Sequence, residues 1–310
     1  MQKIPITVIA GPTASGKTSL SIELAKRYNG EIVSCDSMQF YRFMNIGTAK
    51  PDKEEMSQIV HHMIDILNPD EAFSVAEYVK SAHEVIADIK NRGKNVFIAG
   101  GTGLYINSLV DDVDFCENDS DTTIRNELER LLQECGIDYL VDELKSFDPV
   151  SAEKIHKNNT RRIIRAIEFY KMTGIPISVH QAQTKKKESR YNPLIMAIKT
   201  DMSVLYERIE KRVDIMVEAG LIDEVKTLCD MGYKNAMLSM QGIGYKEVIE
   251  HLNGEISLDD AIAKIKLATR HYAKRQMTWF RRDERICWLD ASADVLELAI
   301  QIYEKWNEKE

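Results

Sequence analysis

The chain has 310 residues and a net charge of −8, with 44% apolar and 29% charged residues. This length allows one large α/β domain plus a smaller one, and the composition is ordinary for a folded globular protein. No stretch approaches the roughly 18 consecutive apolar residues of a membrane helix. The N-terminal apolar run leads into a loop motif, which argues against a signal peptide. We therefore expect a cytoplasmic protein without a membrane partner.

The cysteines and the adjacent histidines give no sign of a metal site or a disulfide framework. The five cysteines are widely scattered and form no CxxC pair: Cys35, Cys116, Cys135, Cys229 and Cys287. His61 and His62 lack an acid–histidine spacing that would close a metal site. We interpret the cysteines as reduced and mostly buried, and the histidines as ordinary polar residues near a strand.

The first third of the chain alternates between strand and helix patterns. Residues 6–10 form an apolar run that predicts a buried parallel strand, and residues 17–28 follow with helical periodicity. Residues 31–35 predict a second strand. Residues 74–91 predict an amphipathic helix that opens with a Ser74–Glu77 capping box, and residues 95–99 predict a third strand.

A long helical segment separates these strands from the next ones. Residues 115–192 show only helical periodicity, whereas 194–199 and 286–289 predict two further strands. Strands that alternate with helices favour a parallel sheet covered on both faces. We therefore expect a discontinuous α/β core, 1–114 and 193–310, with an all-helical insertion at 115–192.

The charge is unevenly distributed within this acidic chain. Residues 111–150 contain 13 acidic and 3 basic residues, whereas residues 153–190 contain 10 basic and 3 acidic ones. Residues 262–285 contain 8 basic and 2 acidic residues. Either basic block alone could be a solvated helix face, but two of them indicate a local binding site for a polyanion.

A phosphate-binding loop follows the first strand. The motif G-x-x-x-x-G-K-[ST] is matched by Gly11, Pro12, Thr13, Ala14, Ser15, Gly16, Lys17 and Thr18. Glycines let backbone N–H groups turn toward a diphosphate, the helix N-terminus adds positive potential, Lys17 adds a full charge and Thr18 can ligate Mg²⁺. The motif is shared with ATP-binding proteins, but it binds a diphosphate and does not dictate that this diphosphate belongs to ATP.

The third strand ends without the carboxylate that nucleotide-hydrolysing P-loop proteins use to hold their metal. It runs instead into Gly100, Gly101, Thr102 and Gly103. The missing acid weakens a kinase or ATPase interpretation and fits a site where the diphosphate is a leaving group.

Asp36 follows the second strand. Ligands of open parallel sheets bind at the carboxyl ends of the strands, so Asp36 is expected to face the same crevice as the P-loop. From its position alone, it could be a general base, a metal ligand or a helix N-cap.

Five motifs occur in an order that points to one family. They are GPTASGKT at the N-terminus, CDSMQFYRFMNIGTAKP at 35–51, GGTGLY at 100–105, RRIIRAIE at 161–168 and KRQMTWFRRD at 274–283. Over residues 5–290 the chain strongly resembles the tRNA dimethylallyltransferase (tRNA isopentenyltransferase) family. The zinc finger of eukaryotic members has no counterpart here, which indicates the bacterial type.

This resemblance implies a P-loop-kinase-like core, Mg²⁺ as cofactor and dimethylallyl diphosphate as donor. The implied acceptor is N6 of the adenosine at tRNA position 37, next to the anticodon. Asp36 matches the family's general base, and Thr102 matches the hydroxyl that orients the reacting centre. Lys17, the other P-loop residues and Lys226 match the diphosphate site, with Thr18 on the Mg²⁺.

The resemblance also implies tRNA contacts in the core and in the insertion, which would grip the anticodon stem-loop. The matching residues are Asp36, Ser37, Met38, Gln39, Thr102, Arg125, Arg161, Arg162, Ile163, Ile164, Arg165, Met240, Gln241, Gly242, Ile243, Gly244, Tyr245, Lys274, Arg275, Gln276, Met277, Thr278, Trp279, Phe280 and Arg281. Some members have arginine where Gln241 and Lys226 stand here, which removes a charge at the first position and a bidentate donor at the second. We expect the chain to act as a monomer.

The helical patterns place several of these cations on exposed faces. Lys266, Arg270, Lys274 and Arg281 share one face of a helix that begins near Ser257, if that helix continues to 281. Trp279 and Phe280 beside this stripe are interpreted as core residues. In the insertion, Arg161 and Arg165 share a face while Ile163 and Ile167 point inward.

Three other functions stay open at this point. An adenylate isopentenyltransferase would share the P-loop and Asp36 but would not need the basic stripes. A small-molecule P-loop kinase would need a metal carboxylate near the third strand. A tRNA-binding protein without catalysis would leave Asp36 and the P-loop without a role.

Overall fold

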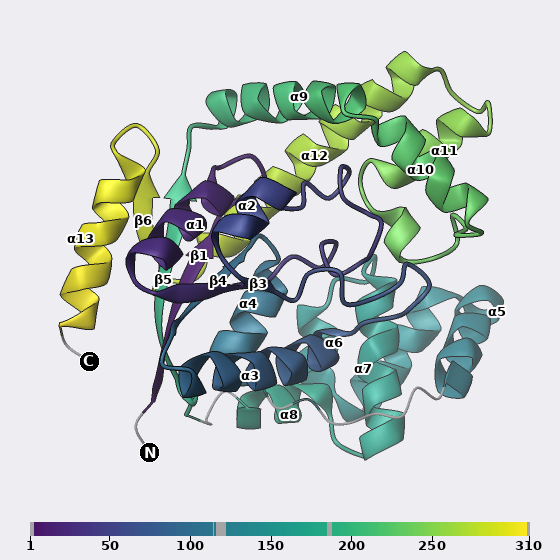
Figure 1. The fold of residues 1–310 in the computed structure, drawn as a ribbon. Helices are drawn as coiled ribbons and strands as arrows, with labels where there is room; N and C mark the ends of the chain where they lie inside the picture. The colour runs from purple at the N-terminus through teal and green to yellow at the C-terminus, as the bar shows by residue number, and fades with distance from the viewer. Residues whose placement is uncertain (1–2, 114, 116–121, 185–187, 309–310) are drawn as a thin grey trace. The chain divides into compact units, whose positions relative to one another are not determined.

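The computed structural model describes residues 3–113, 115, 122–184 and 188–308 (Figure 1). The chain forms two compact units, one made of Met1–Val110 with Arg190–Glu310 and the other of Asp111–Ser189. The sequence placed the boundaries of the insertion at 115 and 192, and the second unit begins and ends slightly earlier. Cys116 and the basic run at 185–187 lie outside the described residues.

The first unit is built on a parallel sheet, as the sequence predicts. The strand order is β3-β2-β4-β1-β5-β6, and all paired strands are parallel. The strands are β1 (Ile4–Ala10), β2 (Gly30–Ser34), β3 (His61–His62), β4 (Asn95–Gly100), β5 (Tyr191–Lys199) and β6 (Cys287–Asp290). The short strand β3, which the sequence analysis did not predict as a strand, pairs with β2.

Helices surround this sheet and extend beyond its carboxyl end (Figure 1). They are α1 (Lys17–Arg27), α2 (Lys53–Gln58), α3 (Val75–Asn91), α4 (Gly103–Val110), α9 (Met202–Glu218), α10 (Leu221–Asp230), α11 (Tyr245–Leu252), α12 (Leu258–Phe280) and α13 (Val295–Asn307), with the 3₁₀ turn η1 (Ser239–Gln241).

Both faces of the sheet are buried. Ile9, Ile32 and Phe97 pack with α1 and α13 in one apolar core. Val8 and Ile98, which neighbour Ile9 and Phe97 along their strands, are also fully buried, and α3 packs on β2 and β4 outside that core. Alternate residues of a strand point to opposite faces, so helices cover the sheet on both sides.

A second apolar core holds the helices that follow β5. Residues of α9 to α12 pack there together with Tyr41 and Met44, which belong to the segment after β2. Leu205 and Ile209 of α9 pack with Ala273 of α12 and with Ala14 of the P-loop. This helical layer therefore contacts both loops in which the sequence predicts functional residues.

The second unit is helical in its described part, in agreement with the predicted periodicity. It contains α5 (Thr122–Phe147), α6 (Pro149–Lys154), α7 (Thr160–Thr173) and α8 (Ile177–Thr184). Gly136 interrupts α5 with a φ of 81° and a ψ of 174°, so this helix is kinked. Leu128, Leu140 and Leu144 of α5 pack against the buried isoleucines of α7.

Local sequence signals explain where several elements begin. Ser74 caps α3 as predicted: its hydroxyl accepts from the Glu77 N–H at 3.2 Å, and the Glu77 carboxylate accepts from the Ser74 N–H at 2.6 Å. At the end of β4, a side chain on Gly100 would collide with the backbone of Cys35. Glycine at this position lets the ends of β2 and β4 approach closely.

The sequence argues against a membrane helix and against a disulfide framework, and the described residues bear on both points. None of its helices combines the length and apolar character needed to cross a membrane. Four of the cysteines are free: Cys35 is buried, Cys135 is exposed, and Cys229 and Cys287 are half-buried.

Candidate active site

The P-loop connects β1 to α1 at the carboxyl edge of the sheet. Gly16 has a φ of 92° and caps α1, a backbone conformation that favours glycine. A side chain on Gly11 would press against the Ser15 hydroxyl. That hydroxyl is buried without a hydrogen-bond partner among the described residues, which suits a group that waits for a ligand. Ala14 has a φ of 63° and is held beneath α9 and α12.

Lys17 begins α1 and lies half-buried in the crevice. Its ammonium donates to the Pro12 carbonyl at 3.4 Å. Burial lowers the pKa of Lys17 to about 8, the Asp36 carboxylate opposes this effect and the Arg212 guanidinium adds to it. A cation that has lost much of its hydration is well placed to bind an incoming anion.

Asp36 follows β2 in the same crevice. Its Oδ1 accepts from the Met38 N–H at 3.1 Å and so stabilises a turn. No helix begins there, so the N-cap alternative is wrong. Burial raises the pKa of Asp36 above its usual range, whereas Lys17 and the Met38 N–H work against that rise. A carboxylate with a raised pKa is a better proton acceptor than an exposed one.

A cavity of about 20 Å³ joins these two residues. Lys17, Thr18, Asp36 and Gln39 line it together with Gly100 of β4. The cavity is large enough for one water molecule or ion. The structure thus brings together the P-loop and the carboxylate that the sequence placed there separately.

The end of β4 supplies glycines and a hydroxyl but no acid, as the sequence indicated. The Thr102 hydroxyl accepts from the Ser37 N–H at 3.4 Å, which keeps it beside Asp36. Within the described ranges, no group of three or more histidine, cysteine or acidic side chains could hold a metal. Oxygen donors from Thr18, Asp36 and Gln39 nevertheless fit Mg²⁺, which keeps several waters and uses few protein ligands when it binds with phosphates.

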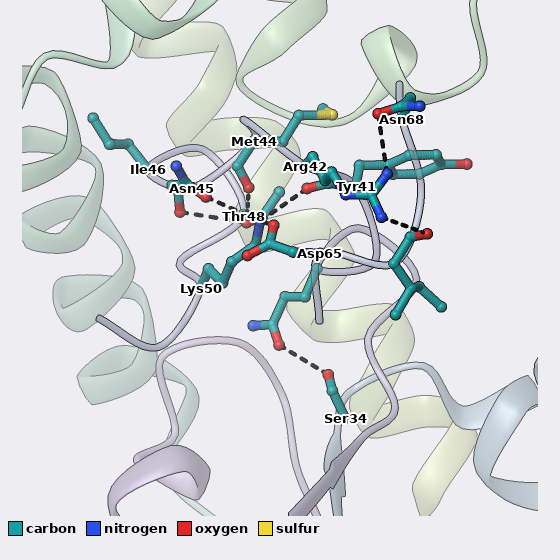
Figure 2. A network of polar contacts seen from close by, with 12 residues as sticks. Ser34, Tyr41, Arg42, Met44, Asn45, Ile46, Thr48, Lys50, Asp65 and Asn68 are labelled. Atoms are coloured by element: carbon teal, nitrogen blue, oxygen red, sulfur yellow. Dashed lines mark hydrogen bonds and ion pairs between the residues drawn. The ribbon is translucent and has the colours of Figure 1, made fainter. Parts of the chain in front are cut away.

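The segment after Asp36 is fixed by buried polar contacts, shown in Figure 2. The Lys50 ammonium, with 3% of its side chain exposed, donates to Asp65 at 2.6 Å, to the Tyr41 carbonyl at 2.8 Å and to Asn45 at 3.0 Å. Arg42 donates to Asn68 at 3.2 Å. These contacts fix the segment after Asp36, which contains most of the motif at residues 35–51.

Glu224 of α10 fixes the same segment from the other side. Its carboxylate accepts from the backbone N–H groups of Asn45 at 2.9 Å, Ile46 at 2.8 Å and Gly47 at 3.1 Å. It also accepts from the Tyr245 hydroxyl at 2.7 Å. Sequence reasoning did not find Glu224, because a lone acid on an amphipathic helix has no local signal for the loop it contacts.

Helix α12 carries a second cavity, of about 360 Å³. It is lined by His271, Lys274, Arg275, Thr278, Trp279 and Arg282. Cations and an indole around a hollow suit a nucleotide, whose phosphate and base they can contact. Trp279, interpreted from the sequence as a core residue, is only half-buried, and Arg282 was not among the predicted contacts.

The predicted basic stripe on α12 is only partly available. Lys266 pairs with Asp214 at 2.6 Å and Arg270 pairs with Glu210 at 2.8 Å, both on α9. Helix α12 ends at Phe280, so Arg281 is its C-cap and does not extend the helical face. The stripe prediction is therefore wrong for Lys266 and Arg270, which hold α12 against α9.

In the second unit, the buried Glu168 carboxylate holds two of the predicted arginines. It accepts from Arg125 at 3.0 and 3.1 Å and from Arg165 at 2.8 Å. Arg161 and Arg162 are exposed on the same helix, α7. The four arginines form a cationic surface, in which the buried Glu168 fixes the orientation of Arg125 and Arg165.

Burial contradicts part of the predicted tRNA contacts. Seven of these side chains lie in the interior of their own units, each 6% exposed or less: Ile163, Ile164, Met240, Tyr245, Gln276, Met277 and Phe280. They were predicted as contacts because they share sequence motifs with exposed neighbours. A helix that binds a ligand with one face packs against the protein with the other, so one motif contains residues of both faces. Their side chains pack in the interior beneath the exposed residues.

Two further expectations change, those for Thr13 and for Lys226. The backbone N–H of Thr13 donates to the Gln276 side chain at 2.9 Å. This N–H of Thr13 is therefore turned away from the diphosphate cradle. Lys226 is exposed, two residues after Glu224 on α10, and so points away from the face that Glu224 turns to the loop. Arg212 of α9 is the cation whose charge reaches Lys17. Gln241 donates to Asn235 at 2.7 Å.

Comparisons with known proteins point to one family. The family model described as IPP transferase matches residues 39–283. A tRNA dimethylallyltransferase of Acetivibrio thermocellus is 52% identical over 285 residues, covering 92% of this chain and 91% of the relative. One from Carboxydothermus hydrogenoformans is 49% identical over 292 residues, covering 94% of each chain.

Solved structures are similar over most of the chain. The tRNA isopentenylpyrophosphate transferase of Bacillus halodurans has a TM-score of 0.73 at 43% identity, covering 100% of this chain and 98% of the other. A eukaryotic dimethylallyltransferase crystallised while acting on tRNA has a TM-score of 0.81 at 31% identity, covering 93% and 74%.

Proposed function

Because the chain belongs to the IPP transferase family of tRNA dimethylallyltransferases, we propose which groups it joins and how. The donor is dimethylallyl diphosphate and the acceptor is N6 of the adenosine at tRNA position 37. A bond forms between N6 and C1 of the dimethylallyl group, the bond from C1 to the diphosphate oxygen breaks, and N6 loses a proton.

Asp36 accepts that proton. The exocyclic nitrogen of adenine is a poor nucleophile, because its lone pair is delocalised into the ring. A carboxylate with a raised pKa, held by the Met38 N–H at one oxygen, can take the proton as the new bond forms. Thr102 lies beside it and orients the reacting centre.

The P-loop, Lys17 and Arg212 receive the leaving diphosphate. Negative charge develops on the diphosphate as the C–O bond breaks, so these cations and N–H groups stabilise the transition state more than the ground state. When bound, Mg²⁺ would supply further positive charge to the diphosphate oxygens, and Thr18 is the residue that would hold it.

The acceptor is a macromolecule, and its target base has to leave the stack of the loop to reach the crevice. Exposed or half-buried residues of both units supply the RNA contacts: Ser37, Met38, Gln39, Arg125, Arg161, Arg162, Arg165, Lys274, Arg275, Thr278, Trp279, Arg281 and Arg282. The chain works as a cytoplasmic monomer.

One observation supports this function most directly. Lys17 and Asp36 line the same cavity at the end of β4, where no acid replaces the glycines. A phosphoryl-transfer site needs a metal carboxylate at that end. Transfer from a diphosphate leaving group needs a cradle and a base, which we assign to the P-loop and to Asp36.

The test is an incubation with labelled dimethylallyl diphosphate, Mg²⁺ and either unmodified tRNA or AMP. The proposal predicts label in tRNA and none in AMP. Label in AMP alone would indicate an adenylate isopentenyltransferase, and γ-phosphate transfer from ATP with unlabelled RNA would indicate a kinase. RNA binding without any transfer would indicate a binding protein.

A further inference from the structure

One face of α12 contacts the loop after β4 at three consecutive residues. The Gln276 side-chain amide donates to the Gly101 carbonyl at 2.9 Å. Burial raises the pKa of Tyr272 and the neighbouring Thr102 side chain lowers it, while a side chain on Gly103 would collide with the Trp279 indole. Residues spaced by four and three share a helix face, so the loop lies along α12.

Gln276 also reaches a second loop. Its Oε1 accepts from the backbone N–H of Thr13 in the P-loop at 2.9 Å. A carboxamide has an acceptor at one end and a donor at the other, so the two contacts together set its orientation. With 5% of its surface exposed, Gln276 is a buried link between the P-loop and the loop after β4.

The glycine at 101 is explained by this link. A side chain there would collide with the Gln276 amide and would also approach the Gly11 carbonyl. The two loops and Gln276 are therefore fitted to one another closely. A change in the position of α12 has to move the Thr13 backbone or break one of these hydrogen bonds.

The same helix carries the surface proposed for RNA. Lys274, Arg275 and Thr278 flank Gln276 in the sequence and are exposed around the cavity of about 360 Å³. One helix thus touches the donor loop through buried side chains and faces the acceptor through exposed ones.

Building on the proposed function, we propose that Gln276 is a positioning residue that couples diphosphate binding to RNA binding. RNA bound to the exposed face of α12 holds the helix in place, and Gln276 then holds the P-loop in the conformation that accepts the diphosphate. Because coupling between two binding sites is reciprocal, a bound diphosphate strengthens RNA binding by the same factor.

Calorimetric titration of the full chain with Mg²⁺ and inorganic pyrophosphate tests this, without RNA and with a saturating unmodified anticodon stem-loop. Gln276→Leu removes both hydrogen bonds at similar side-chain size. Gln276→Glu keeps an acceptor for Thr13 and removes the donor for Gly101. Gln301→Leu is the matched control, since Gln301 is exposed on α13 and bonds only Glu297 among the described residues.

The expected result has three parts. In the wild type and in Gln301→Leu, RNA strengthens pyrophosphate binding about fivefold or more. In Gln276→Leu, pyrophosphate binds about tenfold more weakly without RNA, and RNA changes its affinity by less than about twofold. Gln276→Glu loses the coupling as well but keeps more of the pyrophosphate affinity. Affinity for the stem-loop alone stays within about twofold in all variants.

Three outcomes would overturn the inference. The first is a wild type without coupling, and the second is a folded Gln276→Leu variant with the wild-type coupling factor. The third is a parallel loss of both affinities and of thermal stability in both Gln276 variants, which means a purely structural role. A wild type that binds no RNA would instead overturn the proposed function.

Discussion

Lys17 and Asp36 each counteract the pKa shift that burial causes in the other residue. The Asp36 carboxylate raises the pKa of Lys17 and the Lys17 ammonium lowers the pKa of Asp36. In both cases burial has the larger effect, so the ammonium is more acidic and the carboxyl more basic than usual. The pair is thereby set for an incoming anion and for a proton.

Replacement of the base should abolish transfer and leave RNA binding. In Asp36→Asn, the side chain keeps an oxygen for the Met38 N–H but cannot accept a proton from N6. We expect kcat to fall by about 10²–10⁴, with the affinity for the stem-loop unchanged, measured by single-turnover kinetics and a binding titration. Asp259→Asn, at an exposed position of α12, is the control. Near-normal turnover of Asp36→Asn would remove Asp36 from the mechanism.

Diphosphate affinity should fall as the pH rises through about 8. The pKa of Lys17 is lowered to about 8, so the free chain loses the positive charge above that pH and binds pyrophosphate more weakly. Calorimetry from pH 6.5 to 9.5 measures this limb, and Lys17→Arg corrects for the titration of pyrophosphate itself, because a guanidinium stays charged. An identical pH dependence in both proteins would contradict the assignment.

Charge reversal on the exposed arginines should weaken RNA binding in a salt-dependent way. Arg161→Glu and Arg162→Glu each remove one contact to phosphate, so the slope of log affinity against log salt should decrease by about 1 per contact. Fluorescence titrations at several salt concentrations measure the slope. Lys305→Glu, exposed on α13, should leave it unchanged. Equal slopes for wild type and both arginine variants would refute the contacts.

Glu31 should stabilise the fold at neutral pH but not in acid. Arg92, Lys94 and His62 bind this carboxylate, which is 1% exposed. Hydrogen bonds from Arg92 and then from Lys94 and His62 hold its pKa well below the usual 4.5, although burial works against them. The stabilisation is complete above pH 4.5 and is lost as the pH falls toward the lower folded-state pKa.

Glu31→Gln should therefore lower the free energy of unfolding by about 1–3 kcal/mol at pH 7, with a smaller difference below pH 4. Urea unfolding at both values measures it. Glu23→Gln, exposed on α1, is the control. A difference that grows on acidification would contradict the sign.

Loss of the Glu224 carboxylate should loosen the segment after Asp36. Glu224→Gln keeps one oxygen for the four donors that the carboxylate now accepts from. We expect a loss of about 1–3 kcal/mol in urea unfolding and faster amide hydrogen exchange at Asn45–Gly47. The exposed Glu207 provides the control Glu207→Gln. Unchanged exchange at these amides would show that the loop does not depend on Glu224.

The sequence predicts the sheet well because each central strand is an apolar run of its own, as at Ile6–Ala10 within β1. The sequence does not predict β3, because two adjacent histidines show no strand pattern. They form a strand only through their pairing with β2. Motifs identify Lys17 and Asp36. They cannot identify Arg212, Glu224 or the link made by Gln276, because each acts on residues far away in the chain.

The same limit explains the buried residues among the predicted tRNA contacts. A motif such as RRIIRAIE contains both faces of a helix, and its sequence does not say which members meet a ligand. Helical periodicity separates Arg161 from Ile163, and Phe280 is buried as the sequence suggested, but only packing shows that Met240 is interior. Likewise, Lys266 and Arg270 share a helix face with Lys274, and their acidic partners belong to another helix.

The most direct measurement is the stoichiometry of the reaction on an unmodified tRNA substrate with dimethylallyl diphosphate and Mg²⁺. Mass spectrometry of the RNA locates the added group, and an enzymatic assay counts the released pyrophosphate. We expect one dimethylallyl group on the adenosine at position 37 for each pyrophosphate released, and none with Asp36→Asn. Pyrophosphate release without modified RNA, or modification that persists in Asp36→Asn, would contradict it.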